Sequence, residues 1–331
     1  MKATEIKALI KKFESLKVLV IGDLMLDKYV LGKATRLSPE APVPIVAAQK
    51  TENYLGGAGN VLQNLFSLGA QPIICSVLGK DDAAQEILEL LKKQQLNAAG
   101  ILQSKDRKST VKTRVIGNNH QLLRIDDESS HPLNRKEVSG LIELIQKILK
   151  TKKIDVVIFE DYDKGVITQE VIDEVIKFSQ KNNIPVAVDP KKRNFHKYHH
   201  VDLFKPNFKE LVEGLNLEGK ESDLEINSSV RNFMQTNLHK NVLLTLSERG
   251  VRFITTKESL NKTAHLRQIA DVSGAGDTVI AVAALALALK QKPAVIAEMA
   301  NIAGGIVCEY VGVVPLPKKK FEEECIKLMA K

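Results

Sequence analysis

The chain has 331 residues, 44% of them hydrophobic, which is enough for a large buried core, and it lacks the long uninterrupted apolar run of a membrane-spanning helix. The formal net charge is +8, but the basic residues are spread along the chain with no nucleic-acid-binding motif beside them, so we expect neither a nucleic-acid nor a membrane partner. The amino terminus has no apolar segment of the secretory type, and we expect a cytoplasmic protein with three reduced cysteines.

The amino-terminal part predicts strands and helices in an irregular order. Residues 17–22 form a short apolar, β-branched run typical of a buried strand, and residues 73–78 form another. Between them, residues 29–48 contain three prolines, which exclude a central strand, so we interpret this segment as a projecting edge element with a strand at 43–48. Helices are predicted at 56–68 and 81–93, and strands at 110–116 and 121–125.

From residue 134 a regular alternation of helices and strands begins. Helices are predicted at 134–151, 168–181, from 207 onward, 275–289, 293–310 and 318–329, and strands at 156–159, 185–188, 201–204, 242–246 and 251–255. This alternation predicts right-handed βαβ units, hence an α/β fold with a central, mostly parallel sheet and helices on both faces. We expect residues 1–331 to form one such domain, with a small β appendage built from segments 29–48 and 110–125.

Gly56, Gly57 and Asn60 lie where a predicted helix begins. Glycines at this position let a ligand approach the backbone closely. They suit a tight turn before the helix equally well, and the segment alone does not decide between the two interpretations.

A second small-residue segment, Gly274-Ala275-Gly276-Asp277, precedes a helix that is apolar on almost all sides and therefore deeply buried. Its small side chains leave backbone amides unobstructed at the positive end of that helix, where a phosphate can bind. Asp277 in the first turn then faces whatever docks there. Alternatively, Asp277 only stabilises the helix start, and this segment taken alone favours that simpler interpretation.

The joint occurrence of these motifs in one order resembles the ribokinase-like family of carbohydrate kinases. Between the two glycine-rich signatures, the segment from Asn207 to Glu210 resembles the family's N-x-x-E motif, which is associated with Mg²⁺ and phosphate. The segment from Thr245 to Gly250 resembles its nucleotide-binding segment, with Ser247 where the family has glycine. The resemblance extends over residues 17–315 and implies a three-layer α/β/α fold with a β lid, ATP and Mg²⁺ as cofactors, and a monovalent cation as a further candidate.

Four other segments, at residues 36–44, 121–126, 161–165 and 188–191, resemble the branch of this family that phosphorylates heptose 7-phosphate for lipopolysaccharide synthesis. Members of this branch are often fused to an adenylyltransferase. Since the chain shows no H-x-G-H motif, we expect the stand-alone kinase form. Residues 308–313 depart from the family pattern, which affects the expected contacts to the nucleotide or the cation but not the expected chemistry. The alternatives are a kinase for another sugar or sugar phosphate, of the fructose or tagatose phosphate type, and a non-catalytic sugar-binding regulator.

The resemblance also implies residue roles. Asp277 would accept the sugar hydroxyl proton, facing an open cleft, with the amides of Gly274, Ala275 and Gly276 stabilising the transferred group. Asn207 and Glu210 would hold Mg²⁺ through water. The remaining candidates are Asp27, Gly56, Gly57, Asn60 and Asp161 for the sugar, Arg114, Arg124, Lys164 and Lys191 for its phosphate, and Thr245, Ser247, Gly250 and Asn301 for the nucleotide. The β lid would pair two subunits into a homodimer.

Overall fold

A computed structural model describes residues 1–330 of the chain. Its main sheet has nine strands in the order β13-β12-β11-β10-β9-β8-β1-β4-β5. All pairings from β11 to β5 are parallel, whereas β12 and β13 are antiparallel to their neighbours. The strands are β1 (Lys17–Gly22), β4 (Gln71–Gly79), β5 (Asn97–Ser104), β8 (Val156–Glu160), β9 (Val186–Asp189), β10 (Leu203–Phe204), β11 (Asn241–Thr245), β12 (Val251–Thr255) and β13 (Ser259–Lys262).

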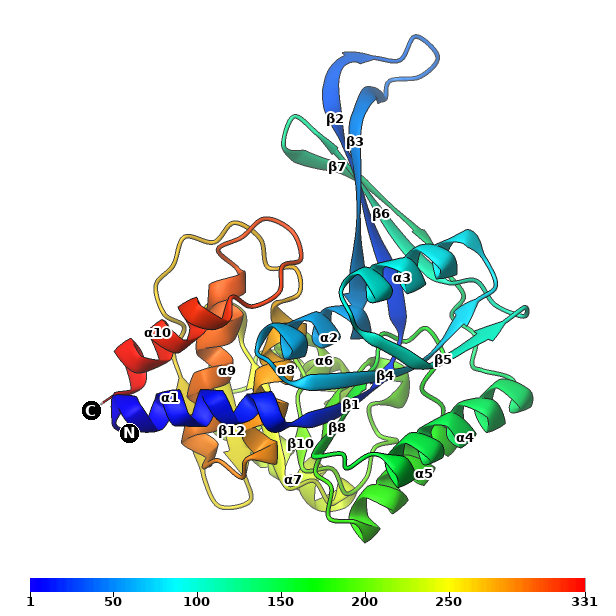
Figure 1. The fold of residues 1–331 in the computed structure, drawn as a ribbon. Helices are drawn as coiled ribbons and strands as arrows, with labels where there is room; N and C mark the ends of the chain where they lie inside the picture. The colour runs from blue at the N-terminus through cyan, green and yellow to red at the C-terminus, as the bar shows by residue number, and fades with distance from the viewer. Residues whose placement is uncertain (331) are drawn as a thin grey trace.

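Helices cover both faces of this sheet (Figure 1). Alternate residues of β1 show why: Val18 and Val20 belong to one hydrophobic core, whereas Leu19 and Ile21 belong to the other. The first core is closed by α1 (Ala3–Lys12), α2 (Ala58–Ser67), α3 (Asp82–Lys93), α8 (Ala275–Ala288), α9 (Pro293–Val307) and α10 (Lys318–Met329). The second is closed by α4 (Arg135–Thr151), α5 (Gln169–Lys181), α6 (Phe208–Leu215) and α7 (Asp223–Asn237). The predicted three-layer arrangement is therefore confirmed.

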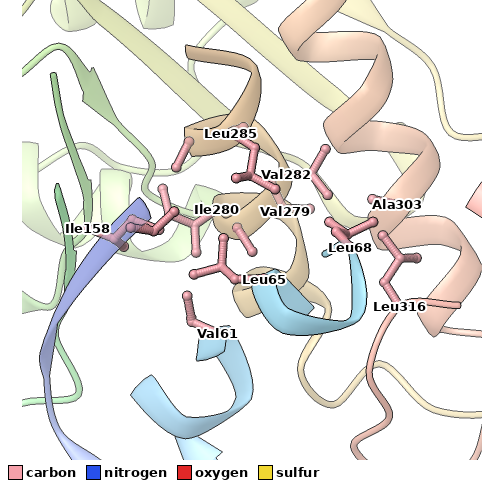
Figure 2. Packing of buried hydrophobic residues seen from close by; sticks show 14 of the residues in the cluster. Val61, Leu65, Leu68, Ile158, Val279, Ile280, Val282, Leu285, Ala303 and Leu316 are labelled. Atoms are coloured by element: carbon pink, nitrogen blue, oxygen red, sulfur yellow. The ribbon is translucent and has the colours of Figure 1, made fainter. Parts of the chain in front are cut away.

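Helix α8 lies at the centre of the first core (Figure 2). It is apolar on almost every side, so it packs against the sheet through Ile280, against α2 through neighbours such as Leu65, and against α9 near Ala303. These three side chains are fully buried. Contacts on all sides fix α8 as a rigid element, and its amino terminus is consequently held at one position over the sheet.

A second sheet projects from the body of the molecule (Figure 1). It has the order β3-β2-β6-β7, formed by β2 (Leu24–Leu37), β3 (Pro44–Gly57), β6 (Thr110–Gly117) and β7 (His120–Asp127). The segments 29–48 and 110–125 lie in these strands, but the β2–β3 hairpin is longer than the sequence predicts. Two of its prolines, Pro39 and Pro42, lie between the strands, and Pro44 is the first residue of the edge strand β3, so none removes a central hydrogen bond.

Four elements are absent from the sequence-based prediction: α1, β5, α7 and β13. Helix α1 buries only Ile6, Leu9 and Ile10, and β13 is a short edge strand whose residues are only half-buried or exposed. Such elements form because neighbours cover them, which a local pattern does not reveal. Within the described residues, every helix is too short or too polar to cross a bilayer.

Candidate active site

The predicted ligand-binding residues gather at the carboxyl ends of β1 and β8. Strand β1 lies between β4 and β8, so the chain leaves it in one direction and later returns on its other side. Open α/β sheets bind ligands at such a switch point, outside the carboxyl ends of the strands. The amino termini of α2 and α8 meet there, since Asn60 of α2 contacts Asp277 of α8.

The carboxylate of Asp277 is buried and receives two hydrogen bonds. Asn60 Nδ2 donates to Oδ2 at 2.7 Å, and the hydroxyl of Tyr162 donates to Oδ1 at 2.7 Å. Burial raises the pKa of Asp277 above its usual value, while the bonds from Asn60 and Tyr162 act in the opposite direction. The expected open cleft in front of the carboxylate is thus covered by the Tyr162 hydroxyl, because a buried carboxylate without such donors would be costly.

Helix α8 begins at the small residues that the sequence singled out. Gly274 has φ +77°, a left-handed conformation that favours glycine, and an added Cβ would lie 2.5 Å from Asn60 Nδ2. The amide of Ala275 donates to the carbonyl of Val272 at 3.3 Å, so it is engaged within the chain. The amide of Gly276 has no hydrogen-bond partner within residues 1–330 and remains available to a ligand.

The glycines before α2 are required by close contacts with neighbouring strands. Gly57 has φ +58°, and a Cβ there would lie 2.5 Å from the carbonyl oxygen of Asp23. Gly56 faces the carboxylate of Asp27, with no room for a side chain between them. Asp27 is buried and forms an ion pair with Arg114 of β6. This pair joins the adjacent strands β2 and β6 of the second sheet, beside Gly56.

Three carboxylates meet beside the start of α8. Glu160, Asp189 and Asp277 each offer an oxygen, and these atoms all lie within 4.8 Å of one another. Asp189 Oδ2 pairs with Lys205 Nζ at 2.7 Å, but both oxygens of Glu160 and Asp189 Oδ1 have no hydrogen-bond partner among residues 1–330. Burial, followed by the charges of Asp189 and Asp277, raises the pKa of Glu160 well above its usual value. Orphaned, buried carboxylate oxygens of this kind fit a divalent cation.

The predicted magnesium residues, Asn207 and Glu210, form the capping box of α6. Asn207 Oδ1 accepts a hydrogen bond from the Glu210 amide, and Glu210 Oε2 accepts one from the Asn207 amide, each at 2.8 Å. The other carboxylate oxygen of Glu210 pairs with Lys191, whose Nζ also lies 3.9 Å from Asp189. Both residues are therefore linked to the carboxylate cluster through Lys191.

The nucleotide candidates divide into two groups. Thr245 ends β11 and forms a parallel bridge with Asn207, and the turn that contains Ser247 and Gly250 follows it. Asn301 lies on α9, where its side-chain amide donates to the carbonyl of Thr263 at 2.8 Å.

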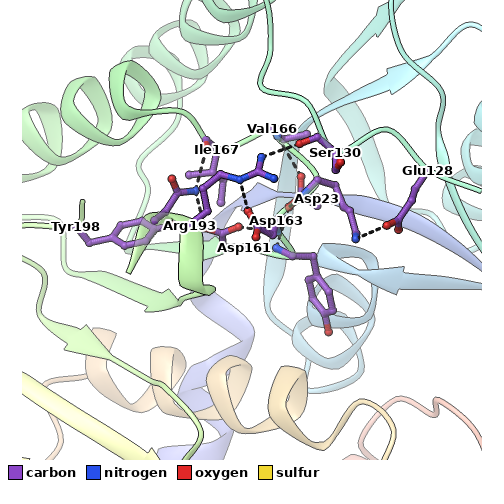
Figure 3. A network of polar contacts seen from close by, with 12 residues as sticks. Asp23, Glu128, Ser130, Asp161, Asp163, Val166, Ile167, Arg193 and Tyr198 are labelled. Carbon is purple, nitrogen blue, oxygen red and sulfur yellow. Dashed lines mark hydrogen bonds and ion pairs between the residues drawn. The ribbon is translucent and has the colours of Figure 1, made fainter. Parts of the chain in front are cut away.

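A loop after β8 places Tyr162 in front of Asp277. The carboxylate of Asp23, at the end of β1, accepts hydrogen bonds from the backbone amides of Tyr162, Lys164 and Val166 at 2.8, 3.1 and 3.1 Å (Figure 3). Asp23 is 1% exposed, and its burial raises its pKa although these three bonds act in the opposite direction. One carboxylate therefore fixes the whole turn from which the Tyr162 hydroxyl reaches Asp277.

Two predicted substrate residues do not join this group. Asp161 is fully buried, and its Oδ2 accepts bonds from Asn194 and the Tyr198 hydroxyl, which makes it a structural anchor of the same loop. Arg124 is half-exposed and pairs with Asp126 two residues along its own strand.

Several residues of the site are not among the sequence-based predictions. Asp23, Glu160 and Asp189 stand at the carboxyl ends of predicted strands, and that position is a signal that could have identified them. Lys205 follows a predicted strand in the same way. No local pattern identifies Tyr162 as the partner of Asp277, because a loop carries it there.

Residues 15–319 match the pattern that defines the pfkB family carbohydrate kinases. The chain belongs to the pfkB family. Members of this family are ATP-dependent sugar kinases, and this pfkB kinase is one of them; membership implies ATP and a divalent metal ion.

Two curated relatives of this pfkB kinase are each named Bifunctional protein HldE. One, from Helicobacter acinonychis, is 38% identical over 296 residues, and one from Mesorhizobium japonicum is 39% identical over 298 residues. The alignments cover 89% and 90% of this chain but 63% and 60% of the relatives. The pfkB kinase chain thus spans about three-fifths of the length of these relatives.

Solved structures confirm the ribokinase-like fold of the pfkB kinase. The tetrameric inhibited form of phosphofructokinase-2 from Escherichia coli has a TM-score of 0.78 at 16% identity, over 93% of this chain and 97% of that one. Arabidopsis thaliana ribokinase complexed with ribose and ATP has a TM-score of 0.72 at 17% identity, over 95% and 99%.

A groove of about 810 Å³ lies elsewhere on the pfkB kinase. It is lined by residues beside the amino ends of the central strands, such as Asp155, Pro185 and Asn241. The groups that can perform phosphoryl transfer lie at the other ends of these strands, so we do not assign the reaction to this groove.

Proposed function

We propose that this pfkB kinase transfers the γ-phosphoryl group of ATP to O1 of D-glycero-β-D-manno-heptose 7-phosphate, giving the 1,7-bisphosphate used in ADP-heptose synthesis for the lipopolysaccharide core. The heptose assignment is supported by the four segments that resemble this branch and by the HldE relatives at 38% identity. The observation that carries the chemistry is Asp277 at the amino terminus of α8, beside the free amide of Gly276.

In this mechanism Asp277 accepts the proton of the sugar O1 hydroxyl as O1 attacks the γ-phosphorus. A positioned base contributes about 10² to 10⁴ in rate. Asn60 holds the carboxylate from one side, and the substrate hydroxyl approaches the oxygen that now accepts the Tyr162 hydroxyl. The Gly276 amide at the positive end of α8 donates to the transferred group as its charge spreads.

A divalent cation fits the orphaned oxygens of Glu160 and Asp189 because Mg²⁺ prefers oxygen ligands and retains several waters. We assign Glu160 and Asp189 as residues that would hold it, with Asn207 and Glu210 beyond its waters. Bound there, Mg²⁺ supplies positive charge to the phosphate oxygens of ATP. Lys191 and Lys205 fix the orientation of the neighbouring carboxylates.

For ATP, we assign the base and ribose end to Thr245, Ser247, Gly250 and Asn301. A crystal structure of Escherichia coli phosphofructokinase-2 is in complex with potassium. We propose a monovalent-cation requirement here as well, measured as the rate with and without potassium at constant ionic strength.

A coupled ADP-release assay on a panel of sugars tests the substrate. We expect turnover with heptose 7-phosphate and at least tenfold lower kcat/KM with fructose 6-phosphate and tagatose 6-phosphate. Absence of turnover with the heptose phosphate would exclude the proposed heptose substrate. Preference for a hexose phosphate would instead indicate a kinase of the fructose or tagatose phosphate type. No turnover with any sugar, together with tight sugar binding, would indicate a regulator.

We also propose that two copies pair through the second sheet. On β7, Leu123 and Ile125 are 54% and 52% exposed and share one face, opposite Val115 and Thr113 of β6. An apolar face on a sheet with open edges favours such an association.

A further inference from the structure

The second sheet presents a polar face to the candidate active site. Along β6, Lys112 and Arg114 are two residues apart and therefore point to the same side. Arg114 reaches Asp27, and Lys112 Nζ lies 5.5 Å from the centre of the Tyr162 ring. Asp27 belongs to the neighbouring strand β2, whereas the contact of Lys112 places this face of the sheet beside the loop that carries Tyr162.

The cations that the sequence offers for the substrate phosphate already have carboxylate partners. Their pairings are Arg114 with Asp27, Arg124 with Asp126, Lys164 with Glu128, and Lys191 with Glu210. Each of these positive charges is neutralised locally, so each would have to exchange its partner before it could bind a phosphate.

Lys112 differs from them. It is half-buried, and its amine has no hydrogen bond and no ion pair to any of residues 1–330. Burial lowers the pKa of Lys112, and the nearby charge of Lys164 lowers it further. Asp126 and Asp27, on the two neighbouring strands, act on this pKa in the opposite direction, but neither carboxylate pairs with the amine. A half-buried amine without a hydrogen bond or ion pair, with a second cation beside it, is a binding position for an anion.

The position of Lys112 relative to Asp277 suits one kind of ligand. The Tyr162 ring lies between them: its hydroxyl is 2.7 Å from Asp277 Oδ1, and its face lies beneath the Lys112 amine. Lys191 also lies over this ring, at 5.3 Å, but it is held by Glu210 on the nucleotide side. A sugar with a free hydroxyl at one end and a phosphate at the other would span from Asp277 to Lys112.

We infer that Lys112 binds the phosphate already carried by the sugar and so makes this enzyme select phosphorylated sugars. The inference rests on the proposed function only in that the substrate is a sugar phosphate; the identity of the sugar is not needed. Lys112 would touch the phosphate directly, with Lys164 adding charge beside it.

The test compares matched substrates with wild-type enzyme and Lys112→Met. Heptose, fructose and tagatose are each assayed with and without their terminal phosphate, at saturating ATP. We expect wild type to favour the phosphorylated form of whichever sugar it accepts, and Lys112→Met to reduce that ratio of kcat/KM values by about 10- to 100-fold, the usual contribution of a hydrogen bond to a charged group. Lys112→Arg, which keeps the charge, should restore most of the preference.

Lys108→Gln is the matched control, since it removes a positive charge just before β6 whose amine pairs with exposed Asp127. It should leave the ratio within about twofold of wild type, in line with the small contribution of exposed ion pairs. The inference is overturned if wild type prefers unphosphorylated sugars, or if Lys112→Met keeps the wild-type preference. If wild type rejects heptose 7-phosphate but selects another sugar phosphate through Lys112, the proposed substrate fails and this inference stands.

Discussion

Asp277 receives hydrogen bonds from two side chains that belong to different elements, Asn60 of α2 and Tyr162 of the loop after β8. The sequence predicted Asp277, Asn60 and the glycines beside them, because those residues form local motifs at helix starts. It could not predict Tyr162, whose place depends on three backbone bonds to Asp23 across 139 to 143 residues. Sequence patterns thus identify the groups on rigid elements more readily than those that a loop brings to them.

Replacement of Asp277 by asparagine tests the base directly. The amide keeps the size of the side chain but cannot accept the hydroxyl proton, so kcat should fall by about two orders of magnitude or more. ATP affinity, measured by calorimetry on the same preparation, should change by less than about threefold. An unchanged kcat would remove Asp277 from the mechanism.

Tyr162→Phe tests the second hydrogen bond through the pH profile. The Tyr162 hydroxyl lowers the pKa of Asp277, so its removal should raise that pKa. Since the base acts in its ionised form, the acidic limb of kcat/KM against pH should move to higher pH in the variant. Tyr54→Phe, whose hydroxyl bonds only to Glu52, is the control and should leave the limb in place. If the acidic limb of Tyr162→Phe stays at the wild-type pH, the assignment of Asp277 as the group that controls this limb is contradicted.

At the scale of elements, the prediction succeeded where burial of one face gives the hydrophobic residues a clear periodicity along the sequence. The long amphipathic helices α4 and α5 and the apolar strands β1 and β8 occur where the sequence indicates. Helix α7 was missed although Ile226, Val230 and Phe233 are spaced for one buried face, because serines and asparagines between them favour helix ends over helix interiors.

Strand β10 and helix α7 also enclose an acid-sensitive group, His239, which follows α7. Its ring stacks on Phe204 with centres 4.9 Å apart, it is 3% exposed, and neither ring nitrogen has a partner among residues 1–330. Burial lowers the pKa of His239 from 6.5 to about 3. Below pH 6.5 the unfolded chain binds a proton that the native state does not, so stability is lost as the pH falls toward 3.

Replacement of His239 by leucine should remove the part of the pH dependence of stability that comes from this histidine. The free energy of unfolding of wild type, relative to the variant, should fall by about 1.4 kcal/mol per pH unit between roughly pH 6 and pH 4. Urea titrations of both proteins at several pH values measure this difference. Parallel pH dependences of the two proteins would show that His239 is protonated in the native state.

At the scale of the whole molecule, the projecting sheet has two unlike faces. One carries Lys112 and Arg114 toward the active site, and the other exposes Leu123 and Ile125. The sequence predicted an appendage from its prolines and its interrupted alternation, but not its length, because the cross-strand pairing of β2 with β3 and β6 is not local.

Ile125→Lys tests the proposed pairing of two copies. A charge placed on the apolar face should shift the protein from dimer toward monomer, with an increase in the dissociation constant of at least tenfold, since burying an unpaired charge is strongly unfavourable. Sedimentation velocity over a concentration series measures this. Lys105→Glu, in the loop before β6, is the control for a change of surface charge. Equal dissociation constants for wild type and Ile125→Lys would exclude this face as the dimer interface.

The hydrogen bonds at Asp277 join residues separated by 217 and 115 positions along the chain. During synthesis the ribosome releases α2 and the Tyr162 loop long before α8 exists, and domains fold as their segments emerge. A nascent chain therefore presents Asn60 and Tyr162 before Asp277 has been made. Under the proposed mechanism phosphoryl transfer requires α8, so nascent chains that lack α8 would be unable to transfer phosphate at this centre.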